Sequence, residues 1–510
     1  YDPQWRDTDG ESIYTWMLKQ SKGAATPPPP PPPPPPVNQP PVANAGADAA
    51  ITLPNNIVSL QGSGTDADGN IVSYEWQKIA GPAQFSIQNT TAAQTTVSNL
   101  VEGQYTFQLR VTDNRGASAT DVVVITVNPT PAPPPALPSG CNSLAPVVHV
   151  LRPTSGTEIY LPQAGGRGWR GGDTVLIPAG TYSLIELGAF QGDPCRPITI
   201  RNQGGVVRVG QIRFTNGAAY FRLTGTGAPG VEYGFVVSGA SNAGVAVGVA
   251  HHVELDHLEV SGHELGIFCK RNPQAQDPQT QYPNYVLSDY YIHHNYIHDT
   301  RAEGMYLGHT SPSGDQLAGG LIPLRMQRVE VAYNRVERTQ LDGIQLSNAR
   351  EGCTIHHNQV VDYGLANKSS HQAGIILGGN TQGEVYQNEV RRGSGNAIQV
   401  FGYGLIRVWG NTVEAAGRDG TPQGQESLFA NDFKTGPEQN PRQEVVVEQN
   451  HFLRPQPKGA VRIGAYNQNS NPATIKNNIL YLPNAPANWL TQYFASNVAN
   501  SMITGNTLTQ

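Results

Sequence analysis

Apolar and polar residues follow a short pattern that recurs along the C-terminal part of the chain. An apolar residue is followed by two variable residues, an asparagine, one variable residue and a second apolar residue. Eight segments carry this pattern, at residues 292–297, 331–336, 355–360, 385–390, 408–413, 447–452, 475–480 and 503–508. A ninth segment, 253–258, has Asp256 at the asparagine position. Fixed short strands at a variable spacing are typical of a solenoid whose insertions loop out from its coils.

A second strand pattern follows the asparagine segment in most coils. It reads glycine, apolar, variable, apolar at residues 266–269, 304–307, 343–346 and 374–377, and it begins with alanine at 397–400 and 460–463. The asparagine amide can stack on the asparagines of the coils above and below, and asparagine tolerates the left-handed backbone of a turn. The two patterns together predict a right-handed parallel β-helix over residues 141–510.

Residues 40–128 alternate apolar and polar positions in short runs between Gly, Asn and Asp turns, which predicts a small β-sandwich. Ten consecutive prolines lie within a predicted spacer over residues 27–39, and a second proline-rich stretch predicts a linker over residues 129–140. The expected fold class is therefore all-β, with a tail at residues 1–26, a sandwich and a solenoid.

The sandwich has four landmarks, at residues 44–46 (Asn-Ala-Gly), 64–69 (Gly-Thr-Asp-Ala-Asp-Gly), 74–76 (Tyr-Glu-Trp) and 110–116 (Arg-Val-Thr-Asp-Asn-Arg-Gly). Together they resemble the polycystic-kidney-disease-type (PKD) domain, which implies an immunoglobulin-like spacer or an accessory unit close to carbohydrate. In some members of that family, acids placed like Asp66, Asp68 and Asp113 bind calcium. The same acids would also suit turns without any metal, because Asp-Gly sequences form turns.

Residues 172–182 (Gly-Asp-Thr-Val-Leu-Ile-Pro-Ala-Gly-Thr-Tyr) and 197–201 (Pro-Ile-Thr-Ile-Arg) resemble the first coils of secreted β-helix proteins related to alginate lyase, chondroitinase B and the wider pectate-lyase-like superfamily. The resemblance covers residues 145–510 and implies the fold. That superfamily contains lyases, hydrolases, epimerases, adhesins and phage spikes, so the chemistry is not implied. The active-site motifs of chondroitinase-type lyases and alginate epimerases are not found residue for residue, and no catalytic residue is carried over.

Composition and charge narrow the setting in which the protein acts. The 510 residues have a formal net charge of -6, which argues against nucleic acid or an anionic membrane as the main partner. No apolar run approaches the roughly 20 residues of a membrane span, and the chain starts at Tyr1, as a mature secreted product would. A disulfide between Cys141 and Cys195 would suit an oxidising compartment. We therefore expect a secreted, extracellular or cell-surface protein.

The middle residues of the second strand pattern should point outward, because side chains alternate along a strand. They form the column Phe268, Tyr306, Gln345, Ile376, Gln399, Phe429 and Arg462. Aromatic and amide side chains on a long face suit stacking on sugar rings and bonding to their hydroxyls. A solvated face with scattered aromatics is the alternative. The expected substrate-binding residues are Phe268, Lys270, Arg271, Tyr306, Gln345 and Gln399.

Two acids stand beside this column. Glu303 and Asp342 precede the glycine on successive coils, which places their backbones about 4.8 Å apart. The pair could supply the acid and the nucleophile of a retaining glycosidase, could hold calcium, or could point into solvent from a stacked turn.

A lyase would instead need a base and a cation that neutralises a uronate carboxylate. The segment 298–309 has the densest mixture of acidic, basic and aromatic groups. The expected catalytic residues are Glu303, Asp342, Arg301 and His309, and further basic groups near the same face are Arg350, Lys368 and His371.

Two functions follow from these observations. The first is a carbohydrate-active protein that binds and cleaves a linear polysaccharide on the outer face of the β-helix, as a lyase or a hydrolase, with calcium as the candidate cofactor. The alternative is a non-catalytic cell-surface adhesin or a structural, filament-forming protein. It would associate with itself or with a partner protein through the N-terminal tail or through a final coil that the sequence leaves open.

Overall fold

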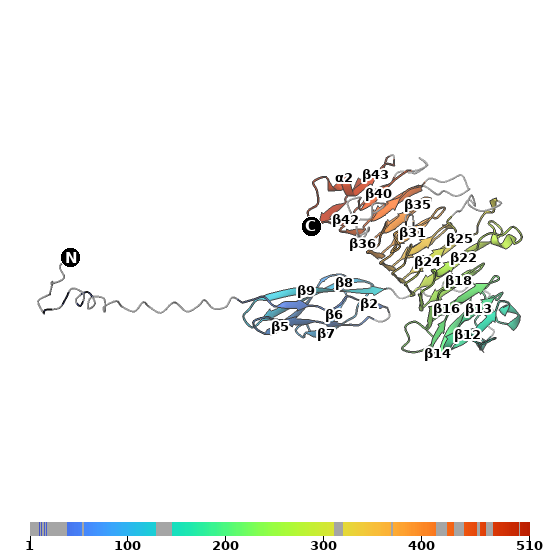
Figure 1. Cartoon of the computed structure of the whole chain (residues 1–510), viewed down its shortest axis with the longest axis horizontal. Helices are drawn as coiled ribbons and strands as arrows, with labels where there is room; N and C mark the ends of the chain where they lie inside the picture. The colour runs from blue at the N-terminus through green and yellow to red at the C-terminus, as the bar shows by residue number, and fades with distance from the viewer. Residues whose placement is uncertain are drawn as a thin grey trace. The chain divides into compact units, whose positions relative to one another are not determined.

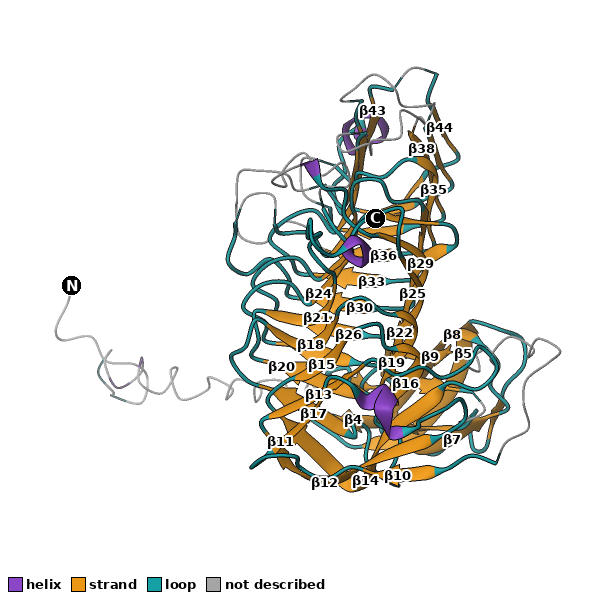
Figure 2. Ribbon diagram, turned by 90° about the vertical axis from the view of Figure 1, so that its right-hand side faces the viewer, coloured by secondary structure: helices purple, strands orange, loops and turns teal. Residues whose placement is uncertain are grey.

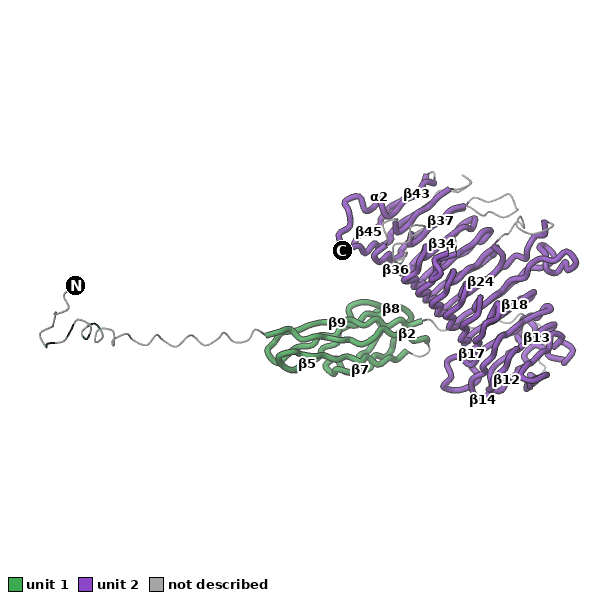
Figure 3. Tube along the Cα trace, in the orientation of Figure 1, with its two compact units in different colours: residues 1–136 green, residues 137–510 purple. Residues whose placement is uncertain are grey.

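The computed structural model describes residues 38–53, 56–128, 145–310, 320–368, 371–414, 426–432, 443–455, 459–465, 473–498 and 500–509, with residues 10, 12, 15 and 17. The chain forms two compact units, residues 1–136 and 137–510 (Figure 3). The predicted N-terminal tail, the proline run and the linker at 129–140 lie almost entirely outside the described residues. Cys195 is disulfide-bonded, whereas Cys269 and Cys353 are free and buried. The expected partner of Cys195, Cys141, also lies outside the described residues.

The first unit is a small β-sandwich, as predicted. One sheet has the order β2 (Ala49–Thr52), β9 (Ser118–Asn128), β8 (Gly103–Asp113) and β5 (Ile71–Ala80), and the other β3 (Val58–Gln61), β7 (Gln94–Ser98) and β6 (Ser86–Ile87). β1 (Val42–Asn44) pairs with β4 (Ser63–Thr65). Alternate residues of β8 are fully buried around Trp76, because one face of each strand packs in the core.

The second unit is a parallel β-helix with two long sheets. The shorter sheet has twelve strands in chain order: β11 (Glu158–Leu161), β13 (Leu184–Gly188), β15 (Ile212–Thr215), β18 (Ala243–Val247), β21 (Leu265–Cys269), β24 (Met305–Leu307), β27 (Ile344–Leu346), β31 (Ile375–Leu377), β34 (Ile398–Val400), β37 (Leu428–Ala430), β40 (Val461–Ile463) and β43 (Phe494–Ser496). Figure 1 shows β18, β24, β31 and β40 following one another along this unit. Each strand after β11 therefore comes from the next coil.

The longer sheet contains the strands on both sides of the asparagine. Those before it are β19 (His251–Asp256), β22 (Val286–His293), β25 (Arg325–Ala332), β29 (Cys353–His356), β32 (Gly383–Tyr386), β35 (Gly404–Trp409), β38 (Gln443–Glu448), β41 (Thr474–Lys476) and β44 (Met502–Thr504). Those after it are β20 (Leu258–Ser261), β23 (Tyr296–His298), β26 (Arg335–Glu337), β30 (Gln359–Val361), β33 (Glu389–Arg391), β36 (Thr412–Glu414), β39 (His451–Leu453), β42 (Ile479–Tyr481) and β45 (Thr507–Thr509).

The remaining strands of the longer sheet lie mostly in the first coils. They are β10 (Val148–Val150), β12 (Thr174–Tyr182), β14 (Ile198–Val209), β16 (Ala219–Thr224), β17 (Phe235–Ser238) and, further along, β28 (Ala349–Arg350). Described helices are short: η1 (Ala164–Arg167), η2 (Pro278–Thr280) and α2 (Trp489–Tyr493). Figure 2 shows the strands of successive coils stacked on one another. Inward Val, Ile, Leu and Phe side chains of all coils form one continuous buried core from Leu151 to Val498.

The repeated asparagines form a buried ladder, as expected from their spacing. Asn334 Nδ2 donates to Asn358 Oδ1 at 2.9 Å, and Asn358 Nδ2 donates to Asn388 Oδ1 at 3.0 Å. The same contact joins each neighbouring pair from Asn295 to Asn506. Every ladder amide also bonds backbone groups of its own or adjacent coils, so these buried polar groups are satisfied.

The left-handed backbone of this turn does not lie at the asparagine, contrary to the sequence interpretation. It lies one residue earlier, at His294 (φ 53°), Tyr333 (φ 56°) and His357 (φ 52°). The preceding residue makes the bend, and the asparagine that follows it places its amide inside the coil. Tolerance of left-handed angles therefore does not explain why the ladder position is asparagine; its buried hydrogen bonds do.

The ninth copy of the pattern is also shifted relative to the prediction. Leu255 pairs with Ile292 and Asp256 pairs with His293, so Leu258 occupies the position of Asn295 in the ladder. The backbone N–H of Leu258 donates to Asn295 Oδ1 at 3.1 Å. The apolar residues of this segment fit two registers, and packing selects the one in which Asp256 faces other polar groups.

The glycines of the second strand pattern are required by close backbone contacts between coils. A Cβ on Gly343 would lie 2.5 Å from Gly374 O and 2.5 Å from Val360 Cγ1. A Cβ on Gly304 would lie 2.6 Å from Gly343 O. The coils can therefore stack at this point only without a side chain. Among the described residues, no helix has the length and apolar character needed to cross a membrane.

Candidate functional site

The structure places the predicted column in register on the twelve-stranded sheet. Phe268 pairs with Tyr306, Tyr306 with Gln345, and Gln345 with Ile376. The column continues through Gln399, Phe429 and Arg462. It is not evenly open, because Gln345 and Ile376 are only 2% and 6% exposed, whereas Phe268, Tyr306 and Gln399 are half-buried. The open parts of the column therefore flank a covered centre.

Three side chains from successive coils meet beside this column. Glu303 and Asp342 lie two residues before β24 and β27, and His371 lies four residues before β31. One potential ligand atom from each of the three lies within 4.8 Å of the other two. His371 Nδ1 is 3.7 Å from Asp342 Oδ2 and 3.8 Å from Glu303 Oε1. The stacking of the coils thus brings the two predicted acids together with a histidine.

Burial and mutual charge dominate the electrostatics of this cluster. Burial raises the pKa of Glu303, and the nearby Asp342 carboxylate raises it further. Burial also raises the pKa of Asp342, which is 1% exposed and accepts a hydrogen bond from the backbone N–H of Ala373 at 2.7 Å. The Asp342 carboxylate raises the pKa of His371 and outweighs the opposite effect of burial. The cluster therefore favours protons, or another source of positive charge, between its acids.

Lys270 and Tyr306 form a pair next to the cluster. Lys270 Nζ donates to the Tyr306 hydroxyl at 3.0 Å and lies 4.5 Å from the centre of its ring. The same hydroxyl lies 3.0 Å from Thr310 Oγ1. The positive charge of Lys270 also acts on Glu303, which shows that the pair and the acids share one neighbourhood.

Other predicted site residues lie elsewhere or make other contacts. The Arg301 side chain turns toward earlier coils, where Nη2 lies 3.3 Å from Glu264 Oε1 of the preceding coil and donates to Ala240 O, one coil further, at 2.7 Å. His309 is buried after β24, and Arg271 is exposed after β21. Arg301 is therefore not brought into the cluster, and roles for His309 and Arg271 remain predictions.

His371 is the member of the cluster that the predicted catalytic set lacks. It was expected only as one of several basic groups near this face. His371 lies outside both strand patterns. The sequence therefore does not indicate which residues of the neighbouring coils lie beside it. A histidine shortly before a strand of the column is the one signal in the sequence that could have identified it.

A second group of acids and a histidine lies in the longer sheet, but its charges are already paired. Arg222 Nε lies 2.8 Å from Asp256 Oδ2 and 3.2 Å from Glu254 Oε1. His293 Nε2 lies 3.0 Å from Glu254 Oε1, and Thr224 Oγ1 donates to Asp256 Oδ1 at 2.6 Å. Contacts with His257 and Arg222 lower the pKa of Asp256 despite its burial. This group is a structural ion-pair network with an arginine at its centre.

The three acids proposed for calcium in the PKD-like unit also have partners within the chain. Asp113 accepts from the backbone N–H groups of Arg115 and Ala117 and from Asn38 Nδ2, at 2.8 to 2.9 Å. Asp68 Oδ2 lies 2.6 Å from Arg115 Nη1. Asp66 Oδ1 faces the backbone N–H of Asp68 at 3.5 Å. Calcium binding by these acids stays a prediction, and turn formation accounts for the local bonds from the N–H groups of Asp68, Arg115 and Ala117.

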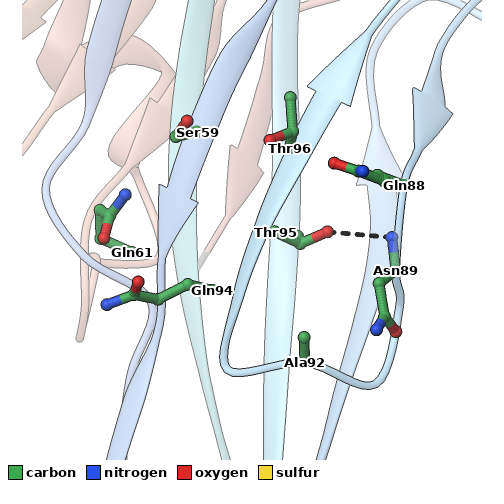
Figure 4. A pocket seen from close by; sticks show the side chains of 8 residues that line it. All are labelled: Ser59, Gln61, Gln88, Asn89, Ala92, Gln94, Thr95 and Thr96. Atoms are coloured by element: carbon green, nitrogen blue, oxygen red, sulfur yellow. Dashed lines mark hydrogen bonds between the residues drawn. The ribbon is translucent and has the colours of Figure 1, made fainter.

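The same unit carries an open pocket of 540 Å³ with uncharged walls (Figure 4). Thr95 Oγ1 accepts a hydrogen bond from the backbone N–H of Asn89 at 3.1 Å within it. Its lining residues are Ser59, Gln61, Gln88, Asn89, Ala92, Gln94, Thr95 and Thr96. The lining residues include no acid or base that could activate the Ser and Thr hydroxyls for catalysis.

Comparison with known proteins agrees with this two-part architecture. Residues 45–127 match a family model for a PKD domain, and residues 222–413 match one described as "Right handed beta helix region". The dyslexia-associated protein KIAA0319 of Homo sapiens is 46% identical over 99 residues, which are 18% of this chain and 9% of that protein. The chain thus spans about a tenth of the length of that curated relative.

Two solved structures are similar to this chain at low sequence identity. Alginate lyase from Paenibacillus sp. str. FPU-7 has 14% identity and a TM-score of 0.33, covering 71% of this chain and 95% of that one. Tailspike gp61 of Pseudomonas phage phi297 has 11% identity and a TM-score of 0.34, and the match covers 66% of this chain and 71% of that one. By its family matches and its own strands, this chain joins a PKD domain to a right-handed parallel β-helix.

Proposed function

We propose that this is a secreted or cell-surface carbohydrate-active protein that binds and cleaves a linear polysaccharide along the twelve-stranded sheet of its β-helix. The observation that carries the proposal is the alignment of the half-buried Phe268 and Tyr306 on consecutive coils, next to the cluster of Glu303, Asp342 and His371. Parallel strands repeat every 4.8 Å or so, a step close to the length of one sugar unit, so successive coils can meet successive sugars.

The position of Asp342 favours elimination over hydrolysis by a double displacement. A retaining glycosidase needs one carboxylate that reaches the anomeric carbon of the sugar. Asp342 is fully buried, and one of its oxygens already accepts the Ala373 N–H. It is therefore poorly placed as a nucleophile.

The Lys270–Tyr306 pair suits the needs of a lyase better. A lyase must neutralise a uronate carboxylate and move the proton beside it. The Lys270 ammonium supplies positive charge, and the half-buried Tyr306 hydroxyl, held at 3.0 Å from it, can exchange a proton with a bound sugar. The expected substrate is consequently an acidic polysaccharide.

An extracellular setting is part of the proposal. The disulfide at Cys195 suits an oxidising compartment, and a PKD domain behind a proline-rich segment suits a spacer that holds a catalytic unit away from a surface. The weakly acidic chain has no excess of positive charge that would favour nucleic acid.

The test is an assay of the whole chain on a panel of acidic and neutral polysaccharides, with calcium and with a chelator. Elimination produces unsaturated uronates that absorb ultraviolet light, whereas hydrolysis produces reducing ends without that absorbance. We expect both signals together on at least one acidic polysaccharide. Reducing ends alone would replace the lyase by a hydrolase, and neither signal on any substrate would contradict cleavage.

A non-catalytic adhesin is the second candidate, favoured by one observation. Gln345 and Ile376 are covered at the centre of the column, so an uninterrupted substrate groove is not evident among the described residues. An adhesin would retain glycans on an affinity column without releasing products, or would assemble with concentration. Self-association through the tail would involve residues outside the described ones, and the final coil is the other predicted contact.

A further inference from the structure

We infer that Glu303, Asp342 and His371 form a binding site for one divalent transition-metal ion. The three residues come from successive coils, and their potential ligand atoms converge within 4.8 Å. Binding of the ion does not depend on the proposed cleavage activity, but an ion at this position would deepen that proposal by supplying the charge that faces a substrate carboxylate.

Two of the three ligand atoms have no other use in the described part of the chain. Asp342 Oδ2 and His371 Nδ1 are both buried atoms, and neither has a hydrogen-bond partner there. Asp342 itself is only 1% exposed, so its unpartnered oxygen is not solvated. A buried carboxylate oxygen without a donor is costly, and an ion between it and the histidine would remove that cost.

The spacing of these atoms fits ligands around an ion better than direct hydrogen bonds. The separations of 3.7 Å and 3.8 Å from His371 Nδ1 exceed the 2.7 to 3.2 Å or so of a hydrogen bond. Ligands about 2.0 to 2.2 Å from a zinc ion lie roughly 3.3 to 3.6 Å from one another. A small contraction of side chains would therefore complete the coordination without moving the strands.

The second acidic group of the molecule provides an internal comparison. There, Arg222 already lies between Asp256 and Glu254 and occupies the place an ion would take. Beside Glu303 and Asp342, no arginine among the described residues makes such an ion pair; Lys270 bonds the Tyr306 hydroxyl instead. The two groups have the same residue types, but only the Asp256 group has an arginine that pairs with both of its acids.

The ligand types indicate the class of metal. One imidazole nitrogen with two carboxylate oxygens is a set that Zn²⁺, Mn²⁺ or Co²⁺ accepts, whereas Ca²⁺ prefers six to eight oxygens. Three protein ligands leave further positions for water or for a substrate carboxylate. The site would accordingly differ from the calcium expected from sequence.

The test is titration of the whole, tag-free chain with Zn²⁺, Mn²⁺ and Ca²⁺ by calorimetry after chelator treatment. We expect one Zn²⁺ or Mn²⁺ ion per chain, with Ca²⁺ at least about tenfold weaker. Replacing a direct ligand in Asp342→Asn or His371→Ala should weaken binding by at least about a hundredfold. The matched control is His293→Ala in the arginine-filled group, which should bind within about twofold of the wild type.

Several outcomes would overturn this inference. They are no saturable binding by the wild type, equal binding by His371→Ala and Asp342→Asn, loss of binding in His293→Ala, or preference for Ca²⁺. His371 is partly exposed, so its alanine variant should keep the circular dichroism of the wild type even if Asp342→Asn does not fold. Metal binding without polysaccharide cleavage would support the metal site and contradict only the proposed function. Cleavage without metal binding would support the proposed function and contradict only the metal site.

Discussion

The asparagine ladder predicts a large and local loss of stability in Asn358→Ala. The two hydrogens of the Asn358 amide are shared among three acceptors, Val331 O, His356 O and Asn388 Oδ1, which lie 2.8, 2.9 and 3.0 Å from its nitrogen. Its oxygen accepts from the backbone N–H and from the amide of Asn334 at 3.0 and 2.9 Å. All five contacts are buried, so water cannot replace them in the folded chain.

The magnitude follows from these contacts. Each net hydrogen bond contributes about 1 kcal/mol, and a buried donor left without an acceptor costs about 1 to 3 kcal/mol. Alanine at position 358 leaves the buried backbone N–H of Asn334 without an acceptor. The Asn334 amide still has Ile292 O and Ala332 O as acceptors. We therefore expect Asn358→Ala to lower the free energy of unfolding by about 3 to 5 kcal/mol.

Hydrogen exchange measured by mass spectrometry gives the most direct assay, because stability in a solenoid is local. Peptides that contain Asn334 should exchange at least about a hundredfold faster in the variant. Gln359→Ala is the matched control, since this neighbouring side chain makes a single side-chain hydrogen bond to the described residues, with Glu389 at 3.3 Å. Asn358→Asp should be worse than alanine at neutral pH, because a carboxylate cannot donate to Val331 O. Equal exchange in Asn358→Ala and Gln359→Ala would refute the reasoning.

Three further predictions concern the glycine contacts, the histidines and the PKD-like unit. Gly343→Ala should lower the thermal midpoint of unfolding by several degrees, because the new Cβ would lie 2.5 Å from Gly374 O. In the control Gly166→Ala, the new Cβ has no neighbour within 4 Å, so this variant should be neutral or slightly stabilising. Burial and the neighbouring His356 lower the pKa of His357 to about 4. Between about pH 6.5 and 4 the unfolded state therefore binds more protons than the folded state, and the free energy of unfolding should fall as the pH drops through that range. In urea melts, His357→Asn should remove up to about 2 kcal/mol of that loss at about pH 5, and an unchanged pH dependence would contradict this assignment. Asp113→Ala, which leaves the N–H groups of Arg115 and Ala117 without their acceptor, should destabilise its unit by about 2 to 4 kcal/mol in calorimetry, with or without calcium.

Much of the solenoid was predictable because its strongest signals are local and repeated. A buried asparagine must find hydrogen-bond partners, and its recurrence once in each coil places the asparagines of neighbouring coils within reach. The glycines at 266, 304, 343 and 374 likewise indicate close contacts between coils. The offset of Asp256 could not be predicted, because residues 253–258 satisfy the apolar pattern in two registers and tertiary packing chooses between them.

The candidate site was predictable only where strands define it. Glu303 and Asp342 precede equivalent strands, so their proximity follows from register. Arg301 is two residues from Glu303, yet its backbone bonds His263 O of the preceding coil and its side chain follows that contact away from the acids. His371 reaches the acids from a connecting segment whose path no strand pattern specifies. The covering of Gln345 also depends on such connections, which vary between coils.

The central claim, that the Lys270–Tyr306 pair and the adjacent column act on polysaccharide, is tested most directly by product formation in two matched tyrosine variants. Tyr306→Phe removes the hydroxyl that Lys270 holds. Tyr296 is the matched control because a cation, Arg335, likewise lies over its ring, 4.7 Å from the ring centre, but on the other sheet of the solenoid. Tyr296→Phe removes its hydroxyl. The account predicts that release of unsaturated uronate from an acidic polysaccharide falls at least about a hundredfold in Tyr306→Phe and stays near wild type in Tyr296→Phe. Equal rates in the two variants, or no release by the wild-type chain, would contradict it.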